Sequence, residues 1–77
     1  MDLRINFCSG VPIYLQLIEQ IKHAVDTGAI RGGEQLPTIR KTAEELAMNP
    51  NTVARAYREL EREGVIDVRH GSGAFVA

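Results

Sequence analysis

Glycine, proline and asparagine divide this chain into short segments, and their positions limit the secondary structures that it can form. Residues 12–27, 38–47 and 49–63 each carry apolar side chains at helical spacing. These segments open with a proline in the first turn or with a capping threonine or asparagine, and Gly28 and Gly64 follow the first and the third. We therefore expect a helix, a second helix, a short turn and a third helix, in that order.

The two ends of the chain have the alternating pattern of strands. Residues 65–69 and 74–76 flank a tip at 70–73 that contains two glycines, which predicts a β-hairpin. Residues 1–10 form a lead-in for which we expect a short edge strand. Its alternating apolar residues are Leu3, Ile5 and Phe7. The predicted fold is mostly α with a small β-hairpin, in one domain over residues 11–77.

The composition is that of one small globular domain. The 77 residues are 44% hydrophobic and 25% charged, and no apolar run approaches the roughly 18 residues that a membrane helix needs. The N-terminus lacks a signal-peptide pattern, and the single Cys8 permits neither an internal disulfide nor a multi-cysteine metal site, so we expect a cytoplasmic protein. We find no nucleophile–base pair and no phosphate-binding loop, so we expect neither an enzyme nor a cofactor.

The first two predicted helices each have one apolar face that fits a core. In the first helix this face comprises Ile13, Tyr14, Leu17, Ile18, Ile21, Ala24 and Val25. In the second helix it comprises Ile39, Ala43, Leu46 and Ala47. Leu15 falls off the first stripe, and it is either a single exposed leucine or part of a subunit contact.

The third predicted helix separates an apolar face from a basic face. The apolar face comprises Val53, Ala56, Tyr57 and Leu60. The opposite arc comprises Asn51, Arg55, Arg58 and Arg62. A rod about 10–12 Å across with such a face fits the DNA major groove, which is about 12 Å wide. The alternative is a solvated charged face with helical salt bridges, such as one between Arg55 and Glu59.

The context of this basic face favours nucleic acid. A helix of about ten residues, a tight break at Met48-Asn49 and a capped helix have helix-turn-helix spacing. The hairpin adds a wing, whose tip combines Arg69 and His70 with glycines. Arginine and histidine can enter the negative minor groove, and glycine permits close approach of the backbone. The alternative is that His70 is only an exposed loop side chain and that the glycines serve only the turn.

Several short motifs along the chain share one resemblance. They are Leu36-Pro37-Thr38-Ile39-Arg40, Ala43-Glu44-Glu45-Leu46, Asn49-Pro50-Asn51-Thr52-Val53, Arg55-Ala56-Tyr57, Leu60-Glu61, Glu63-Gly64 and Gly71-Ser72-Gly73-Ala74-Phe75-Val76. Together they resemble the winged helix-turn-helix domain of GntR-type transcriptional regulators, over about residues 11–76. Pro12-Ile13-Tyr14 and the Asn-Pro-Asn-Thr-Val turn are similar to the YtrA-like subfamily in particular. The resemblance implies three helices plus a two-stranded wing.

The resemblance implies DNA contacts at the matched positions. These are Arg40 near the start of the second helix, Asn49, Asn51 and Thr52 around the start of the third, Arg55 and Arg58 on its groove-facing side, and His70, Gly71 and Ser72 at the wing tip. Beside them, we expect Lys41 to contact the DNA backbone and Arg69 to contact the minor groove. Pro50 and Ala54 stand where many members have arginine, and we expect Arg55 to replace the latter.

We therefore expect sequence-specific binding of double-stranded DNA by a transcriptional repressor, with the third helix in the major groove and the wing at the minor groove. The acidic residues should face away from the DNA, among them Glu19, Asp26, Glu34 and Glu61. The alternative is a winged-helix module whose third helix packs on a protein partner. The resemblance also implies a homodimer on a pseudo-palindromic operator in a longer regulator, whose effector is unknown because its site would lie outside this chain. Dimerisation of this chain through its first helix or lead-in is a further alternative.

Overall fold

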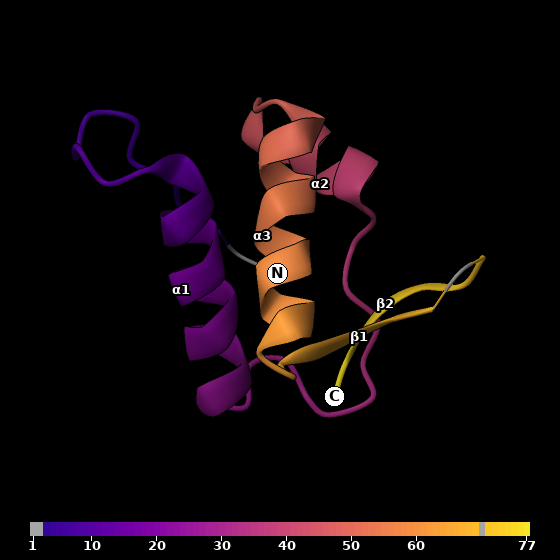
Figure 1. The fold of residues 1–77 in the computed structure, drawn as a ribbon. Helices are drawn as coiled ribbons and strands as arrows, with labels where there is room; N and C mark the ends of the chain where they lie inside the picture. Colours follow the sequence, from indigo (N-terminus) through magenta and orange to yellow (C-terminus); the bar gives the residue numbers. More distant parts are fainter. Residues whose placement is uncertain (1–2, 70) are drawn as a thin grey trace.

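The computed structural model describes residues 3–69 and 71–77, which form three helices and a two-stranded hairpin (Figure 1). In chain order the elements are α1 (Ile13–Asp26), α2 (Ile39–Leu46), α3 (Pro50–Arg62), β1 (Ile66–Arg69) and β2 (Gly73–Val76). The predicted winged helix-turn-helix fold is confirmed, because the three helices and both strands of the hairpin lie within about one residue of their expected bounds. None of the helices in these ranges is long and apolar enough to cross a membrane.

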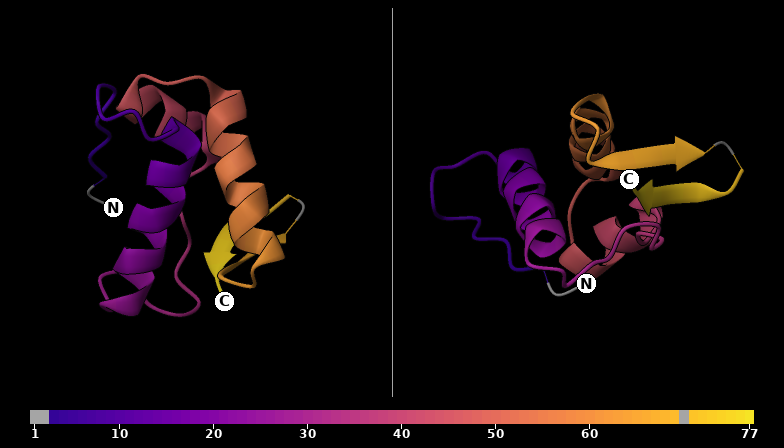
Figure 2. Two further views of the ribbon diagram at one scale, coloured as in Figure 1. Left: turned by 60° about the vertical axis from the view of Figure 1, so that its left-hand side comes forward. Right: turned by 90° about the horizontal axis from the view of Figure 1, so that it is seen from below.

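The helices enclose a small aliphatic core, and the hairpin projects from them as a wing. α1 and α3 lie side by side, α2 crosses behind the start of α3, and β1 follows directly from the other end of α3 (Figures 1 and 2). The buried residues are Leu17, Ile18, Ile21, Ile30, Leu36, Ala43, Val53, Ala56, Tyr57, Leu60, Ile66, Ala74 and Val76. The apolar face expected for the third helix is thereby confirmed. That of the first helix is buried at Leu17, Ile18 and Ile21, and its other residues are half-buried.

Local hydrogen bonds define the turn between α2 and α3. Thr38 caps α2 by accepting a hydrogen bond from the backbone nitrogen of Lys41 at 3.1 Å. Asn49 caps α3 in the same way, accepting from the backbone nitrogen of Asn51 at 2.8 Å. Between the two caps, Ala47 ends α2 with a φ of 52°, in the left-handed region that a non-glycine residue adopts at a cost of about 1–3 kcal/mol. The break expected at this point is therefore a strained turn, in which the backbone nitrogen of Met48 donates to the Ala43 carbonyl at 3.0 Å and Asn49 caps the helix that follows.

The predicted apolar face of α2 is wrong in part. Ala43 is buried as expected, but Ile39 remains 36% exposed and Ala47 lies exposed in the turn. Thr42 occupies the core instead, with only 2% of its surface exposed. Its hydroxyl forms a hydrogen bond of 3.1 Å with the hydroxyl of Tyr57, and a satisfied hydrogen bond is what allows a polar side chain to be buried.

The predicted edge strand is wrong for residues 3–10, the part of the lead-in that the structure describes. Glutamine side chains of α1, rather than a neighbouring strand, satisfy the backbone there. Gln16 accepts from the backbone nitrogen of Asn6 at 2.8 Å and donates to its carbonyl at 2.9 Å. Gln20 forms the same two bonds with the backbone of Arg4. Two glutamines one helical turn apart thus bind alternate residues of the lead-in.

The loop before α2 contacts the wing near its tip. The hairpin is antiparallel, with Arg69 opposite Gly73 at its tip. Gln35 donates from Nε2 to the backbone oxygen of Ser72 at 2.9 Å. Gly73 has a φ of +111°, and a Cβ at this position would lie 2.7 Å from the same nitrogen of Gln35. The absence of a side chain at Gly73 therefore lets the loop approach the wing closely.

Candidate nucleic-acid interface

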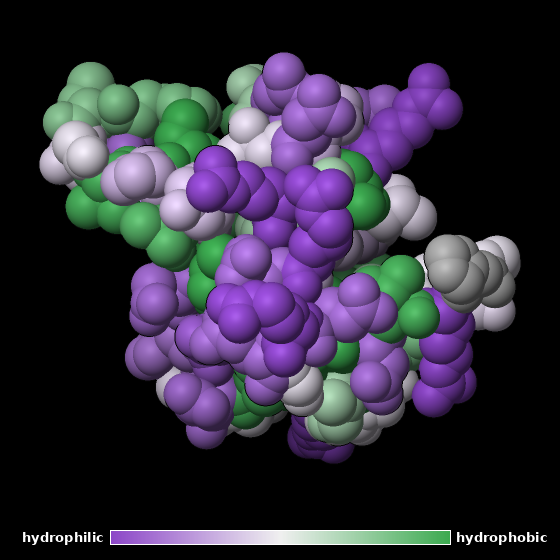
Figure 3. Space-filling view, in the orientation of Figure 1, coloured by the Kyte–Doolittle hydropathy of each residue, from purple (hydrophilic) through white to green (hydrophobic). Residues whose placement is uncertain are grey.

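The exposed side of α3 carries the basic residues that the sequence pattern placed there. Asn51, Arg55, Arg58 and Arg62 are all exposed, opposite the buried face of the same helix. Figure 3 shows strongly hydrophilic side chains gathered over the middle of this face, in front of α3. The predicted separation of a core face from a basic face is thus confirmed.

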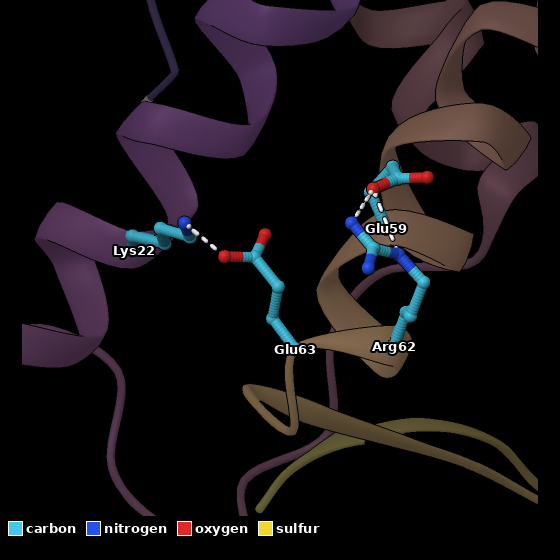
Figure 4. A network of polar contacts seen from close by, with 4 residues as sticks. All are labelled: Lys22, Glu59, Arg62 and Glu63. Atoms are coloured by element: carbon cyan, nitrogen blue, oxygen red, sulfur yellow. Dashed lines mark hydrogen bonds and ion pairs between the residues drawn. The ribbon is translucent and has the colours of Figure 1, made fainter.

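One of the three arginines on this face is engaged by a carboxylate of its own helix. Arg62 donates to Glu59 through Nη2 at 2.7 Å and through Nε at 3.2 Å (Figure 4). The hydrogen bond from Arg62 is the main reason why the pKa of the Glu59 carboxyl lies below its usual value. Glu59 therefore pairs with Arg62 and not with Arg55, the partner considered in the sequence-based alternative.

A second ion pair joins α1 to the end of α3. Nζ of Lys22 lies 2.7 Å from Oε1 of Glu63, the residue that follows α3 (Figure 4). The hydrogen bond to Glu63 raises the pKa of the Lys22 ammonium. Because both side chains remain partly exposed, the pair contributes little to stability and joins the two helices only weakly.

Arg55 and Arg58 leave α3 toward different neighbours. The guanidinium carbon of Arg55 lies 3.7 Å from the centre of the Tyr14 ring on α1. Arg58 lines a groove of about 240 Å³ between α3 and the wing. Neither arginine forms an ion pair within residues 3–69 and 71–77. The structure therefore separates two residues that the sequence pattern placed on one arc.

The groove beside Arg58 is the place where three elements meet. Its walls come from the start of α2, one side of α3 and the wing, and they comprise Pro37, Thr38, Ile39, Ala54, Tyr57, Arg58, Glu61, Val68, Gly73 and Ala74. Much of this lining is apolar, and Ile39 and Val68 are substantially exposed in it. Glu61 also lines the groove, so one of the acidic residues that we expect to face away from DNA lies beside Arg58. Residues 58 and 61 are nearly one helical turn apart and share a face.

The start of α2 and the start of α3 supply further polar groups. Arg40 and Lys41 are exposed in the first turn of α2. Nε of Arg40 lies 3.7 Å from Oε1 of Glu44, but 89% of the Arg40 side chain is exposed, so this pair restrains it weakly. Asn51 is exposed and Thr52 half-buried in the first turn of α3. These residues lie where the sequence analysis expected them.

The wing carries one cation that the structure describes. The guanidinium carbon of Arg69 lies 5.0 Å from the centre of the Phe75 ring on the opposite strand. Gly71 has a φ of +81°, and the backbone nitrogen of Ser72 donates to the carbonyl of Arg69 at 3.0 Å, which closes the tip. His70, a predicted contact residue, lies outside the described residues.

Two buried hydroxyl groups connect α2 to α3. Tyr57 donates to the carbonyl of Pro37 at 2.8 Å, and its oxygen lies 3.1 Å from the Thr42 hydroxyl. Burial raises the pKa of the Tyr57 phenol, against an opposing effect of the bond to Thr42. The sequence pattern identified Tyr57 as a core residue but missed Thr42, because only packing brings the two hydroxyls together.

We expect Tyr57→Phe to lower the free energy of unfolding by about 1–3 kcal/mol near neutral pH, because the Pro37 carbonyl and the Thr42 hydroxyl lose their partner. The raised pKa of Tyr57 in the folded state adds stability that is present below pH 10, the ordinary pKa of the group, and is lost as the pH rises through the folded value. The variant should lack this alkaline loss. Urea unfolding at about pH 7 and about pH 11 measures both effects. Tyr14→Phe is the control, and equal effects of the two substitutions would contradict the prediction.

Residues 13–76 match the family described as bacterial regulatory proteins, gntR family. The chain is also 41% identical, over 75 residues, to the HTH-type transcriptional repressor YtrA of Bacillus subtilis (strain 168). That alignment covers 97% of this chain and 58% of the relative, so the chain spans less than two thirds of the relative's length.

Solved structures with the same fold differ widely in their sequence identity to this chain. A structure described as a transcriptional antiterminator from Listeria monocytogenes EGD-e has a TM-score of 0.96 at 43% identity, over 100% of this chain and 57% of its own. YtrA from Sulfolobus acidocaldarius, described as a GntR-family transcription factor, has a TM-score of 0.89 at 36% identity, over 97% of this chain and 63% of its own. AraR(DBD) in complex with operator ORX1 has a TM-score of 0.88 over 100% of this chain and 99% of its own, and at 24% identity it shows likeness of fold alone.

Proposed function

Because this chain belongs to the gntR family of bacterial regulatory proteins, we propose that it serves a transcriptional regulator by binding double-stranded DNA. In this proposal α3 enters the major groove and the wing reaches the adjacent minor groove. Membership of the family, with the likeness to YtrA, was expected from the sequence motifs and is confirmed. It places the chain among regulators rather than enzymes, which also agrees with the expectation.

The observation that most supports this proposal is that each of the three elements that form the groove carries an exposed cation. Arg58 of α3 lines the groove directly. Arg40 on α2 and Arg69 on β1 are exposed on the two other elements but do not themselves line the groove. The net charge of the chain is only −1, so it is the placement of exposed guanidinium groups on α2, α3 and β1, and not the total charge, that favours a polyanionic partner.

The proposed contacts follow from the chemistry of each side chain. We assign guanine edges or phosphates to Arg58 and Arg55, and phosphates or adenine to Asn51 and Thr52. The proposed backbone contacts of α2 and the turn come from Arg40, Lys41 and Asn49. The proposed minor-groove contacts come from Arg69, His70, Gly71 and Ser72.

We further propose that residues 11–77 are the DNA-binding domain of a cytoplasmic regulator, with residues 1–10 as its lead-in. Two copies in a homodimer would lie about 34 Å apart on a pseudo-palindromic operator. One domain by itself would bind a half-site weakly, because it lacks the avidity of the pair. The name of the Bacillus relative, a transcriptional repressor, supports repression as the regulatory outcome.

Selection of bound duplexes from a random pool, followed by fluorescence anisotropy with the 77-residue chain, tests the proposal. We expect an enriched sequence, and we expect log affinity to fall with log salt at a slope of about 0.9 for each phosphate contact. A scrambled duplex is the control that separates sequence recognition from simple charge attraction. No enrichment, together with an affinity that ignores salt, would reject DNA binding and favour the alternative of a winged-helix module that packs on a protein.

A further inference from the structure

Tyr14 connects α1 to the basic face of α3. Its ring lies in the first turn of α1, and the guanidinium carbon of Arg55 stands 3.7 Å from the ring centre, which is the geometry of a cation–π contact. Tyr14 is half-buried against the core, whereas Arg55 is exposed. A ring held by the core thus restrains a long side chain that would otherwise sample many rotamers.

This kind of restraint leaves the guanidinium able to bind a further group. The N–H donors of arginine lie in the plane of the guanidinium and point outward from its edge, so a ring stacked on its face uses none of them. Arg62 provides the contrast, because it gives two donors to Glu59, whose carboxylate also offsets its charge. Arg55 therefore presents both its charge and its donors at a restricted place on the surface.

We infer that Tyr14 is a positioning residue that holds Arg55 in place for a DNA phosphate. The inference rests on the proposed function and extends it to α1, to which that proposal assigns no DNA contact. Arg55 lies on the α1 side of α3, away from the groove that Arg58 lines, so it reaches the DNA backbone beside α3 rather than the base edges. Because Tyr14 orders Arg55 before binding, less conformational entropy is lost when the phosphate is bound.

A double-mutant cycle in the 77-residue chain tests the inference with the selected duplex. Tyr14→Leu removes the ring but keeps an apolar side chain, and it should weaken binding about three- to tenfold, the effect of ordering one long side chain. Tyr14→Phe keeps the ring and should bind like the parent chain. In the background of Arg55→Ala, Tyr14→Leu should change the affinity by less than about twofold, because the group through which Tyr14 acts is gone.

Sequence preference provides a second readout. A phosphate contact carries no base information, so Tyr14→Leu should weaken the selected and the scrambled duplex by the same factor. A change in the ratio of the two affinities would overturn the assignment of Arg55 to the DNA backbone.

The cycle also distinguishes positioning from general packing. An equal loss in both backgrounds would show that Tyr14 acts by packing, and no loss in the parent background would show that Arg55 needs no support; each result overturns the inference. Urea unfolding gives the folded fraction of every variant, and Tyr14→Met replaces Tyr14→Leu if the latter does not fold.

A parent chain that binds no selected duplex rejects the proposed function, and the inference with it. A parent chain that binds with the expected salt dependence but shows no coupling rejects only the role of Tyr14.

Discussion

Leu17→Ala is expected to lower the free energy of unfolding by about 2–5 kcal/mol, the largest effect on stability that we predict for a single substitution. Leu17 is 0% exposed and lies on the face of α1 that packs against α3. The substitution removes buried methyl groups and leaves a cavity that a close-packed core fills only in part. At roughly 0.05–0.15 kcal/mol per residue, a domain of this size has about 4–12 kcal/mol in total, so the loss is a large fraction of it.

Leu15 supplies a matched control for this measurement, since it lies two residues away on the same helix and is 38% exposed. Leu15→Ala should change the free energy of unfolding by less than about 0.5–1 kcal/mol in the same urea titration. Similar losses for the two variants would show that the core is not where the structure places it. Sedimentation of the parent chain tests the other interpretation of Leu15, a subunit contact: a monomer across the micromolar range would remove it.

Arg58→Glu is expected to weaken binding of the selected duplex by about tenfold to several hundredfold. Removing an arginine that contacts DNA costs about 1–3 kcal/mol, and a carboxylate in its place adds repulsion from the phosphates. Glu61 lines the same groove, so the variant would place a second negative charge there. The salt dependence should also become shallower, by about one unit of slope for each phosphate that the variant no longer neutralises.

Arg31→Glu is the control for Arg58→Glu, because it makes the same change in net charge in the loop between α1 and α2. It should weaken binding only slightly, through long-range electrostatics that salt screens. Neither substitution should change the unfolding transition by much, since both side chains are exposed. Equal effects of the two variants on affinity would contradict the placement of the DNA interface at the groove.

Much of the fold was predictable because helix ends and faces are local properties of the chain. Thr38 and Asn49 were expected to cap helices from their side-chain chemistry, and both make the capping hydrogen bond. Spacing alone also predicted that Val53 and Leu60 lie on the side of α3 that faces the hydrophobic core, and both are fully buried. The basic face followed from the same periodicity.

The errors arose where the outcome depends on segments distant in sequence. Alternation in the lead-in predicted a strand, but Gln16 and Gln20 of α1 bind its backbone, so no strand partner is needed. Periodicity in α2 favoured Ile39 over Thr42 for the core, although the hydroxyl of Tyr57, 15 residues further along the chain, stabilises the buried threonine. Hydrophobic pattern carries no information about such a partner.

The candidate interface also combines features that the sequence pattern predicts with features that only tertiary packing determines. Periodicity was sufficient to place Arg55, Arg58 and Arg62 on the solvent side of one helix, because a helix of fixed pitch presents every third or fourth residue on one face. Which neighbours Arg55 and Arg58 meet depended on how α1 and the wing pack against α3, and this packing assigns them to Tyr14 and to the groove, whereas Arg62 pairs with Glu59 of its own helix. The contacts of Arg55 and Arg58 join residues of different elements through space, so no local pattern in the chain encodes them.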